Sequence, residues 1–244
     1  MRIKLWHTPS KPERPLKEWE RWTSLLSADE MSQVERYRHA EARDQHAVGR
    51  SIARKMLAVE KAIDPRTIEL EALPHGKPIV RSPSIARRPF NIAHTRGLVI
   101  CGMACGDTSP NAHMGVDVES LARETTPDLA ERYFAQPEVD YLRRQPNQIA
   151  IRETFLRIWT LKESFIKAIG TGLSTPLADF AFEDIHSDQP RIQMLSDELK
   201  SDKQWRFEVF HPRPGFIASV AVCEGQLTDC PELDLKCVDL EQVA

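Results

Sequence analysis

The 244-residue sequence lacks the features that mark several specialised classes of protein. No segment approaches 18 consecutive apolar residues, so we expect no helix that crosses a membrane. The cysteines form no CxxC pair and show no zinc-type spacing with histidine, which argues against structural zinc. Their odd number favours free thiols in a reducing compartment. The five are Cys101, Cys105, Cys223, Cys230 and Cys237.

A large excess of charge of one sign is also missing. The formal net charge is −3, so overall electrostatics does not indicate a nucleic-acid-binding protein. The first residues, MRIKLWHTPSK, contain no apolar run of the kind found in signal peptides. We therefore expect a cytoplasmic protein that has neither nucleic acid nor a membrane as its partner.

Basic residues are concentrated in one region of the first half. They are Arg36, Arg38, Arg43, Arg50, Arg54 and Lys55. Such a cluster suits a phosphorylated or acidic partner, and a solvent-exposed helix face accounts for it equally well.

The hydrophobic patterns that are present predict an α+β fold made of two halves. In the first half, Ser27 and Glu30 form a capping-box pattern that opens one long helix, which extends through 31–63. In the second half, the patterns predict a strand, two helical segments and a further pair of strands. The predicted segments are 114–120, 126–144, 149–169 and 205–223.

Three segments follow from these patterns. The first half is expected to span 1–110 and the second half 111–226, with a C-terminal tail of 227–244 that contains one short strand. The glycines of GTGLS are expected to end the last helix just past Lys167.

The segment MGVDVES carries two acidic residues on one face of a predicted strand. Asp117 and Glu119 are two positions apart, so their side chains share a face and lie roughly 6–7 Å apart. Like charges this close repel each other unless a cation lies between them. The pattern indicates a site for Mg²⁺ or Mn²⁺, or two carboxylates on a solvated sheet face.

The helix at 149–169 carries three charged residues beside its apolar face. Lys162 falls in the centre of the apolar stripe, Glu163 at its margin, and Lys167 one turn after Glu163. These residues suit a site that holds both a cation and phosphates. A surface ion pair between Glu163 and Lys167, with the Lys162 ammonium reaching water, is the alternative.

Two motifs of the first half carry less information on their own. His94 follows a strand and precedes a glycine-containing turn, where it is either a structural residue or part of a site. The segment HGKP places Lys77 in a tight turn before Pro78.

Taken together, the segments HGKPIV, FNIAHT, MGVDVE and WTLKESFIKAIGTGLS resemble, in order and spacing, the 4′-phosphopantetheinyl transferase family. The similarity is to the long type, which activates peptide and polyketide synthases. It implies a monomer, a pseudo-dimer of two similar α+β halves with coenzyme A bound between them and the metal site at the junction. It also implies transfer of 4′-phosphopantetheine from coenzyme A to a serine of an apo acyl or peptidyl carrier protein. Adenosine 3′,5′-bisphosphate is the other product, and the carriers serve fatty-acid, nonribosomal peptide or polyketide biosynthesis.

The resemblance assigns roles in catalysis to residues of the second half. Asp117, Glu119 and Glu163 correspond to the family's ligands for Mg²⁺, with Mn²⁺ as an alternative. Lys167 corresponds to the lysine that meets the pyrophosphate and assists proton transfer. Glu163 is the first candidate for the base that takes the serine proton, directly or through a metal-bound water. We expect the Lys162 ammonium to point toward the pyrophosphate or the metal carboxylates.

The resemblance also assigns coenzyme A contacts to the first half. His94 corresponds to the family histidine that contacts a phosphate, and the turn with Lys77 and Pro78 to part of the adenine and 3′-phosphate pocket. Arg43 or Arg50 would meet the 3′-phosphate or the carrier. Many family members have serine before the histidine, where this chain has Ala93.

Two other functions stay open at the level of the sequence. One is an Mg²⁺-dependent hydrolase or another transferase that acts on coenzyme A or nucleotides. The other is a non-catalytic homologue that binds carrier proteins.

Overall fold

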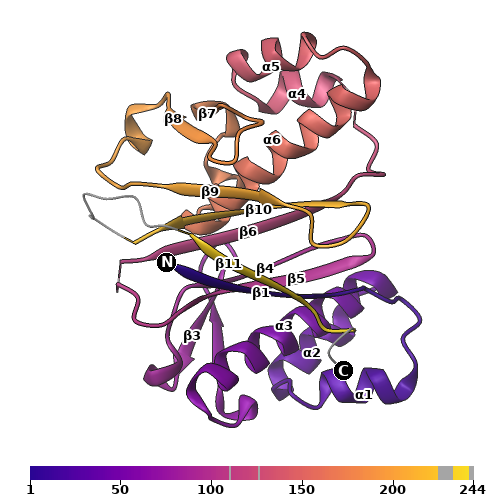
Figure 1. Cartoon of the computed structure of the whole chain (residues 1–244). Coiled ribbons are helices and arrows are strands. Elements are labelled where there is room, and N and C mark those ends of the chain that lie inside the picture. Colours follow the sequence, from indigo (N-terminus) through magenta and orange to yellow (C-terminus); the bar gives the residue numbers. More distant parts are fainter. Residues whose placement is uncertain (110, 126, 225–232, 242–244) are drawn as a thin grey trace. The chain divides into compact units, whose positions relative to one another are not determined.

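The computed structural model describes residues 1–109, 111–125, 127–224 and 233–241 (Figure 1). Contacts divide the chain into two compact units. Unit 1 comprises Met1–Pro110 together with Leu233–Ala244, and unit 2 comprises Asn111–Glu232. Part of the segment that the sequence analysis set apart as a C-terminal tail therefore belongs to unit 1.

Unit 1 is built on a four-stranded sheet in the order β11-β1-β5-β4. Strand β5 is antiparallel to both β1 and β4, whereas β11 lies parallel to β1, beside it in Figure 1. The strands are β1 (Arg2–Thr8), β4 (Phe90–Thr95), β5 (Leu98–Cys105) and β11 (Asp234–Asp239), with a separate hairpin of β2 (Glu69–Ala72) and β3 (Pro78–Ser82). The helices are α1 (Leu16–Thr23), α2 (Ala28–Arg36) and α3 (Ala40–Lys61), with 3₁₀ turns at Pro65–Thr67 and Ser84–Ala86.

The long helix predicted through 31–63 is wrong, because the chain breaks between α2 and α3. The predicted capping box is present: the Ser27 hydroxyl accepts from the Glu30 N–H, and the Glu30 carboxylate accepts from the Ser27 N–H. Glu30 also forms an ion pair with Arg54, at 2.8 Å. In one continuous helix these two residues would lie about 36 Å apart. The buried pair therefore requires α2 to fold back beside α3, and the backbone is extended at Tyr37 and His39.

The core of unit 1 lies between α3 and the sheet. Helix α3 buries one apolar face, including Val48, Ile52 and Met56, and packs on β5 and β4. At Gly49 a Cβ atom would lie 2.8 Å from a methyl group of Ile92, so glycine allows the helix to pass close to β4.

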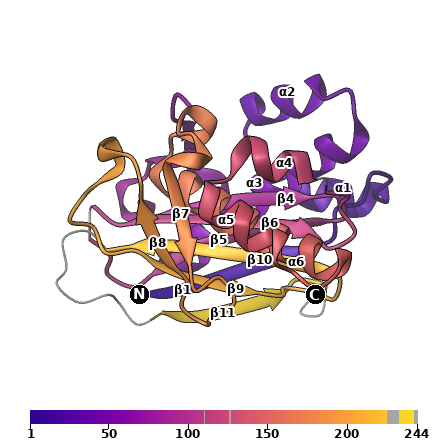
Figure 2. The same cartoon turned by 90° about the horizontal axis from the view of Figure 1, so that it is seen from above.

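Unit 2 repeats this combination of one long helix and an antiparallel sheet. Its three-stranded sheet has the order β6-β10-β9, and α6 packs across β6 and β10 (Figure 2). The strands are β6 (His113–Ser120), β9 (Arg206–Phe210) and β10 (Phe216–Cys223), with a hairpin of β7 (Phe180–Glu183) and β8 (Arg191–Met194). The helices are α4 (Pro127–Tyr133), α5 (Gln136–Arg143) and α6 (Gln148–Ile169), with 3₁₀ turns at Gly172–Ser174, Leu177–Asp179 and Asp197–Leu199.

The helix that carries Glu163 ends where the sequence predicted. Gly170 follows the last residue of α6 with a φ of 79°, the left-handed conformation that glycine adopts without strain. Helices α3 and α6 each have 22 residues, and each covers antiparallel strands. The predicted α+β fold class is confirmed. Among the described helices, none has the length and apolar character needed to cross a membrane.

Candidate active site

The three predicted metal ligands lie on two adjacent elements of unit 2. Asp117 and Glu119 belong to β6, and Glu163 belongs to α6, which packs on that strand. Burial and the negative charge of Asp117 raise the pKa of Glu163 to about 7, and Glu119 adds to this effect. The structure therefore brings the three carboxylates close enough for their charges to interact.

A glycine at the start of the same motif brings strand and helix together. A Cβ atom at Gly115 would lie 2.0 Å from the carbonyl oxygen of Ser164 and 2.5 Å from the backbone nitrogen of Ala168. Only glycine permits this approach of β6 to the backbone of α6. Because alternate residues of a strand share a face, Asp117 and Glu119 point to the side of the strand that Gly115 presents to α6.

Two cations neutralise part of this acidic cluster. The Lys167 ammonium donates to Oδ1 of Asp117 at 2.5 Å, and Arg123 forms an ion pair with Glu119. The pKa of Lys167 is raised, with Asp117 as the main stabilising charge and burial opposing it. The surface ion pair between Glu163 and Lys167 that the sequence left open is therefore replaced by a half-buried pair between Lys167 and Asp117.

The donor set fits a hard divalent cation. Asp117 is buried, at 5% exposure, and its Oδ2 atom has no hydrogen-bond partner within the described residues. Carboxylate oxygens are the ligands that Mg²⁺ and Mn²⁺ prefer. In the described parts of the chain, no group of three or more His, Cys, Asp or Glu side chains is already arranged around a metal position. A metal bound by Asp117 and Glu119 would compete with Lys167 and Arg123, which pair with these two carboxylates in the structure.

The expectation that Lys162 faces this cluster is wrong. Its side chain is fully buried, and its ammonium donates to the carbonyl oxygens of Leu177 and Phe180, at 2.7 Å and 2.6 Å. A third contact, at 2.8 Å, is an ion pair with Glu138 of α5. An ammonium has three N–H groups, and all three are used in the core. Lys162 therefore has no donor left for a phosphate.

Sequence reasoning missed Glu138, because its partner lies 24 positions away. Glu138 is itself buried and accepts from the backbone N–H groups of Ala135 and Phe182. Burial raises the pKa of Glu138 and lowers that of Lys162, while each partner's charge acts in the opposite direction. The apolar stripe of α6 thus accommodates a lysine by means of a buried counter-ion.

Arg123 is the other functional candidate that sequence reasoning missed. It follows β6 in a turn where its N–H donates to the carbonyl oxygen of Ser120 at 2.9 Å. Its guanidinium lies over the Trp159 ring, with 4.8 Å between the guanidinium carbon and the ring centroid. The feature of the sequence that could have pointed to Arg123 is its position four residues after Glu119.

The predicted coenzyme A residues Lys77, Pro78 and His94 lie in unit 1. His94 is exposed near the end of β4, where it pairs in register with Val99 of β5. Lys77 lies in the predicted turn, and its carbonyl oxygen accepts from the Leu73 N–H at 2.9 Å. Burial lowers the pKa of Lys77 to about 8, and the neighbouring Pro78 is buried.

The basic cluster of α3 does not form a single exposed face. Arg43 is exposed and lies over Trp19, at 5.6 Å from the ring centroid, whereas Arg50 is half-buried. Burial lowers the pKa of Arg50. Arg54 is 2% exposed and is occupied by Glu30 and by backbone carbonyl groups. Arg54 is therefore a structural residue and is not available to a partner, whereas Arg36, Arg38 and Arg43 are exposed.

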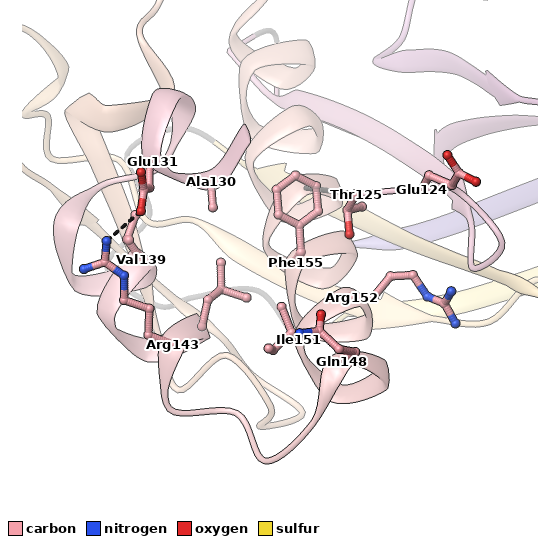
Figure 3. Close-up of a pocket in the computed structure, with 11 residues that line it drawn as sticks. Glu124, Thr125, Ala130, Glu131, Val139, Arg143, Gln148, Ile151, Arg152 and Phe155 are labelled. Atoms are coloured by element: carbon pink, nitrogen blue, oxygen red, sulfur yellow. Dashed lines mark hydrogen bonds and ion pairs between the residues drawn. The ribbon is translucent and has the colours of Figure 1, made fainter. Parts of the chain in front are cut away.

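A cavity of about 390 Å³ in unit 2 was also not predicted (Figure 3). Its wall includes apolar side chains from α4, α5 and α6, namely Ala130, Val139 and Phe155. At its rim, Arg143 and Glu131 form an ion pair at 2.6 Å. Phe155 stacks on Trp159, with ring centroids 5.9 Å apart, so this wall supports the ring on which Arg123 lies.

Comparisons with known proteins show which family this chain resembles over most of its length. The family model described as "4'-phosphopantetheinyl transferase superfamily" matches residues 113–223, and the model "4'-phosphopantetheinyl transferase, N-terminal" matches residues 9–105. A 4'-phosphopantetheinyl transferase of Bacillus subtilis is 31% identical over 69% of this chain and 72% of that protein. The proteins Sfp and ffp, from the same species and described as 4'-phosphopantetheinyl transferases, are 29% and 30% identical. These matches cover 95% and 90% of this chain, and 96% and 92% of the relatives.

Proposed function

Because this chain belongs to the 4′-phosphopantetheinyl transferase family, we propose that it transfers 4′-phosphopantetheine from coenzyme A to a serine of an apo carrier protein. The products are the holo carrier and adenosine 3′,5′-bisphosphate. The observation that carries the proposal is the meeting of Asp117, Glu119, Glu163 and Lys167 on the facing surfaces of β6 and α6. A carboxylate cluster beside a lysine suits a reaction at a pyrophosphate group, whose negative charge must be neutralised.

We assign the metal to the three carboxylates. Asp117, Glu119 and Glu163 would hold Mg²⁺, or Mn²⁺ in its place. When bound, the metal would neutralise the pyrophosphate and act as a Lewis acid there. The unpartnered Oδ2 atom of buried Asp117 supports this assignment.

Two residues of the protein are assigned to the leaving group's negative charge and to the proton of the acceptor serine. Lys167, next to Asp117, is placed to donate to a phosphate oxygen and to stabilise the leaving group as negative charge develops there. Glu163 is the group we assign to accept the serine proton, directly or through one ordered water.

The contacts with coenzyme A are assigned to unit 1. His94 would donate to a phosphate, and the turn of Lys77 and Pro78 would border the adenine and the 3′-phosphate. Arg43 or Arg50 would meet the 3′-phosphate or the carrier. Lys162 is not assigned a contact with coenzyme A, because its ammonium is bound by Glu138 and the Leu177 carbonyl oxygen in the core.

The oligomeric state, the cellular location and the carrier substrates complete the proposed function. We propose a monomer in the cytoplasm that depends on Mg²⁺ and modifies acyl or peptidyl carriers of fatty-acid, nonribosomal peptide or polyketide biosynthesis. The sequence similarity over most of the chain supports the reaction class and does not choose among these carriers.

The test is mass spectrometry of apo carriers incubated with the protein, coenzyme A and Mg²⁺. The expected result is a carrier heavier by one phosphopantetheine, and no gain on a carrier whose acceptor serine is alanine. Glu163→Gln should abolish the gain while the protein stays folded. Loss of coenzyme A without a modified carrier would identify a hydrolase instead, and binding of the carrier without either change would identify a non-catalytic homologue.

A further inference from the structure

Arg123 holds a metal-site carboxylate without belonging to the predicted set of ligands. Its Nη1 atom pairs with Oε1 of Glu119, and its side chain keeps about one third of its surface exposed, at 32%. Glu119 is mostly buried, with 13% of its side-chain surface exposed. The arginine of this pair is thus more exposed to solvent than the carboxylate that it neutralises.

A second contact holds the guanidinium independently of Glu119. It lies over Trp159, whose ring is fixed by stacking with Phe155 and by an edge contact with Tyr133, at centroid distances of 5.9 Å and 6.0 Å. A cation on the face of an indole is held by attraction to the ring quadrupole. If Arg123 leaves Glu119, it therefore still has an attachment point beside the site.

A divalent cation and a guanidinium compete for the same carboxylate oxygen. A partly exposed ion pair contributes only about 0–1 kcal/mol, so its exchange is not costly. A metal ion that also binds Asp117 and Glu163 gains two further carboxylates, whereas Arg123 gains none. Binding of the metal should therefore release Arg123 from Glu119.

We propose that Arg123 is a displaceable counter-ion of Glu119 that becomes a phosphate-binding residue for coenzyme A once a divalent cation occupies Glu119. This inference rests on the proposed function, because that function places a metal and phosphates at the cluster. The planar guanidinium matches phosphate oxygens in geometry and charge. Unlike Lys167, Arg123 lies on an aromatic ring, that of Trp159. This contact keeps the guanidinium near the site both with and without a bound metal.

The experiment measures two affinities of the full-length protein. Mn²⁺ binding without coenzyme A is followed by electron paramagnetic resonance of free Mn²⁺, and coenzyme A binding at saturating Mn²⁺ by calorimetry. Arg123→Gln should bind Mn²⁺ several-fold more tightly, because the competing cation is gone. The same variant should bind coenzyme A about tenfold more weakly, as expected for the loss of one hydrogen bond between charged groups.

Two further variants separate this role from general effects of charge. Arg132→Gln removes an exposed arginine that lies over Tyr133 and has no contact with Glu119 in the described structure, and both of its affinities should match the wild type. Arg123→Lys keeps the charge and loses the planar fork, so it should bind Mn²⁺ as the wild type does and coenzyme A at an intermediate strength.

Each outcome bears on a different part of the inference. Unchanged Mn²⁺ affinity in Arg123→Gln would overturn the counter-ion role, and unchanged coenzyme A affinity would overturn the phosphate role. Glu163→Gln is the check on the proposed function: if it bound Mn²⁺ as tightly as the wild type, the metal assignment itself would fail. A failure of Arg123 alone would leave that assignment intact.

Discussion

Lys162 illustrates how the meaning of one residue depends on a partner that is distant in sequence. A lysine in an apolar helical stripe must have its charge satisfied, and the sequence pattern indicated a ligand as the source of the opposite charge. The structure supplies it with Glu138 and two backbone carbonyl groups in the core. Lys162, which neighbours Glu163 in the motif, therefore stabilises the fold, whereas Glu163 is the residue we propose for the metal site.

Removing one partner of this buried pair should be strongly destabilising. Lys162→Met leaves Glu138 buried without its counter-ion, and we expect the free energy of unfolding to fall by about 3–5 kcal/mol. Urea denaturation measures this change. Lys200→Met, which breaks an exposed pair with Asp197, should cost less than about 1 kcal/mol. Equal losses in the two variants would contradict the buried role of Lys162.

Lys77 should make stability depend on pH in the alkaline range. Its pKa is about 8 in the folded protein and 10.5 when unperturbed. The folded protein therefore loses the Lys77 proton at a lower pH than the unfolded chain does. The charged amine therefore destabilises the fold below pH 8, and this cost disappears as the pH rises toward 10.5. Lys77→Met should exceed the wild type in free energy of unfolding at pH 7.

The measurement is urea denaturation of both proteins at several pH values. The advantage of Lys77→Met should shrink between pH 8 and pH 10.5. A constant difference over this range would show that burial does not hold the Lys77 amine toward its neutral form.

At the scale of elements, the contact between β6 and α6 sets the geometry of the acidic cluster. Gly115 allows the strand to approach the helix backbone, and Gly170 ends the helix one turn beyond Glu163. Both glycines stand in the sequence motifs, but only the helix end could be predicted from them. The close approach at Gly115 depends on which helix packs on the strand, and local pattern carries no such information.

Gly115→Ala should separate the strand from the helix. The added methyl group would overlap backbone atoms of Ser164 and Ala168, which cannot move as a side chain can. We expect a loss of about 1–3 kcal/mol in the free energy of unfolding, and weaker Mn²⁺ binding because Asp117 moves away from Glu163. Ser120→Ala, at the end of the same strand, is the control and should change neither quantity by a comparable amount.

The elements that the sequence predicted correctly are those determined by local pattern. Strand β6 and helix α6 follow from periodicity, and α2 begins at the capping box of Ser27 and Glu30. The break between α2 and α3 was missed because it depends on the ion pair of Glu30 with Arg54. Likewise the family motif pointed to Asp117, Glu119 and Glu163, whereas Arg123 was found only when its contacts were visible.

At the scale of the whole molecule, the proposed ligand sets are divided between two units. Asp117, Glu119 and Glu163 belong to unit 2, and Lys77 and His94 belong to unit 1. A shared site for coenzyme A and the metal therefore stays a prediction, and it has a thermodynamic consequence. Ligands that bind only the folded protein stabilise it, by about 2.7 kcal/mol at a concentration of 100 Kd.

Coenzyme A and Mg²⁺ together should raise the Tm more than the sum of their separate effects. The reason is that the positive charge of Mg²⁺ attracts the negative phosphates of coenzyme A if both ligands occupy one site. Differential scanning calorimetry with each ligand alone and with both measures this difference. In Glu163→Gln the joint effect should vanish while any effect of coenzyme A alone persists; strictly additive shifts in the wild type would argue for separate sites.

The parallel pairing of β11 with β1 has a consequence for how the protein is made. Arg2 of the first strand pairs with Asp234, from the other end of the sequence. During synthesis, the β1 edge of this sheet must wait for almost the entire chain, including all of unit 2, to emerge from the ribosome. Unpaired strand edges promote wrong associations between chains. We therefore expect β1 to present an unpaired edge during translation until β11 emerges, and to be open to such associations during that interval.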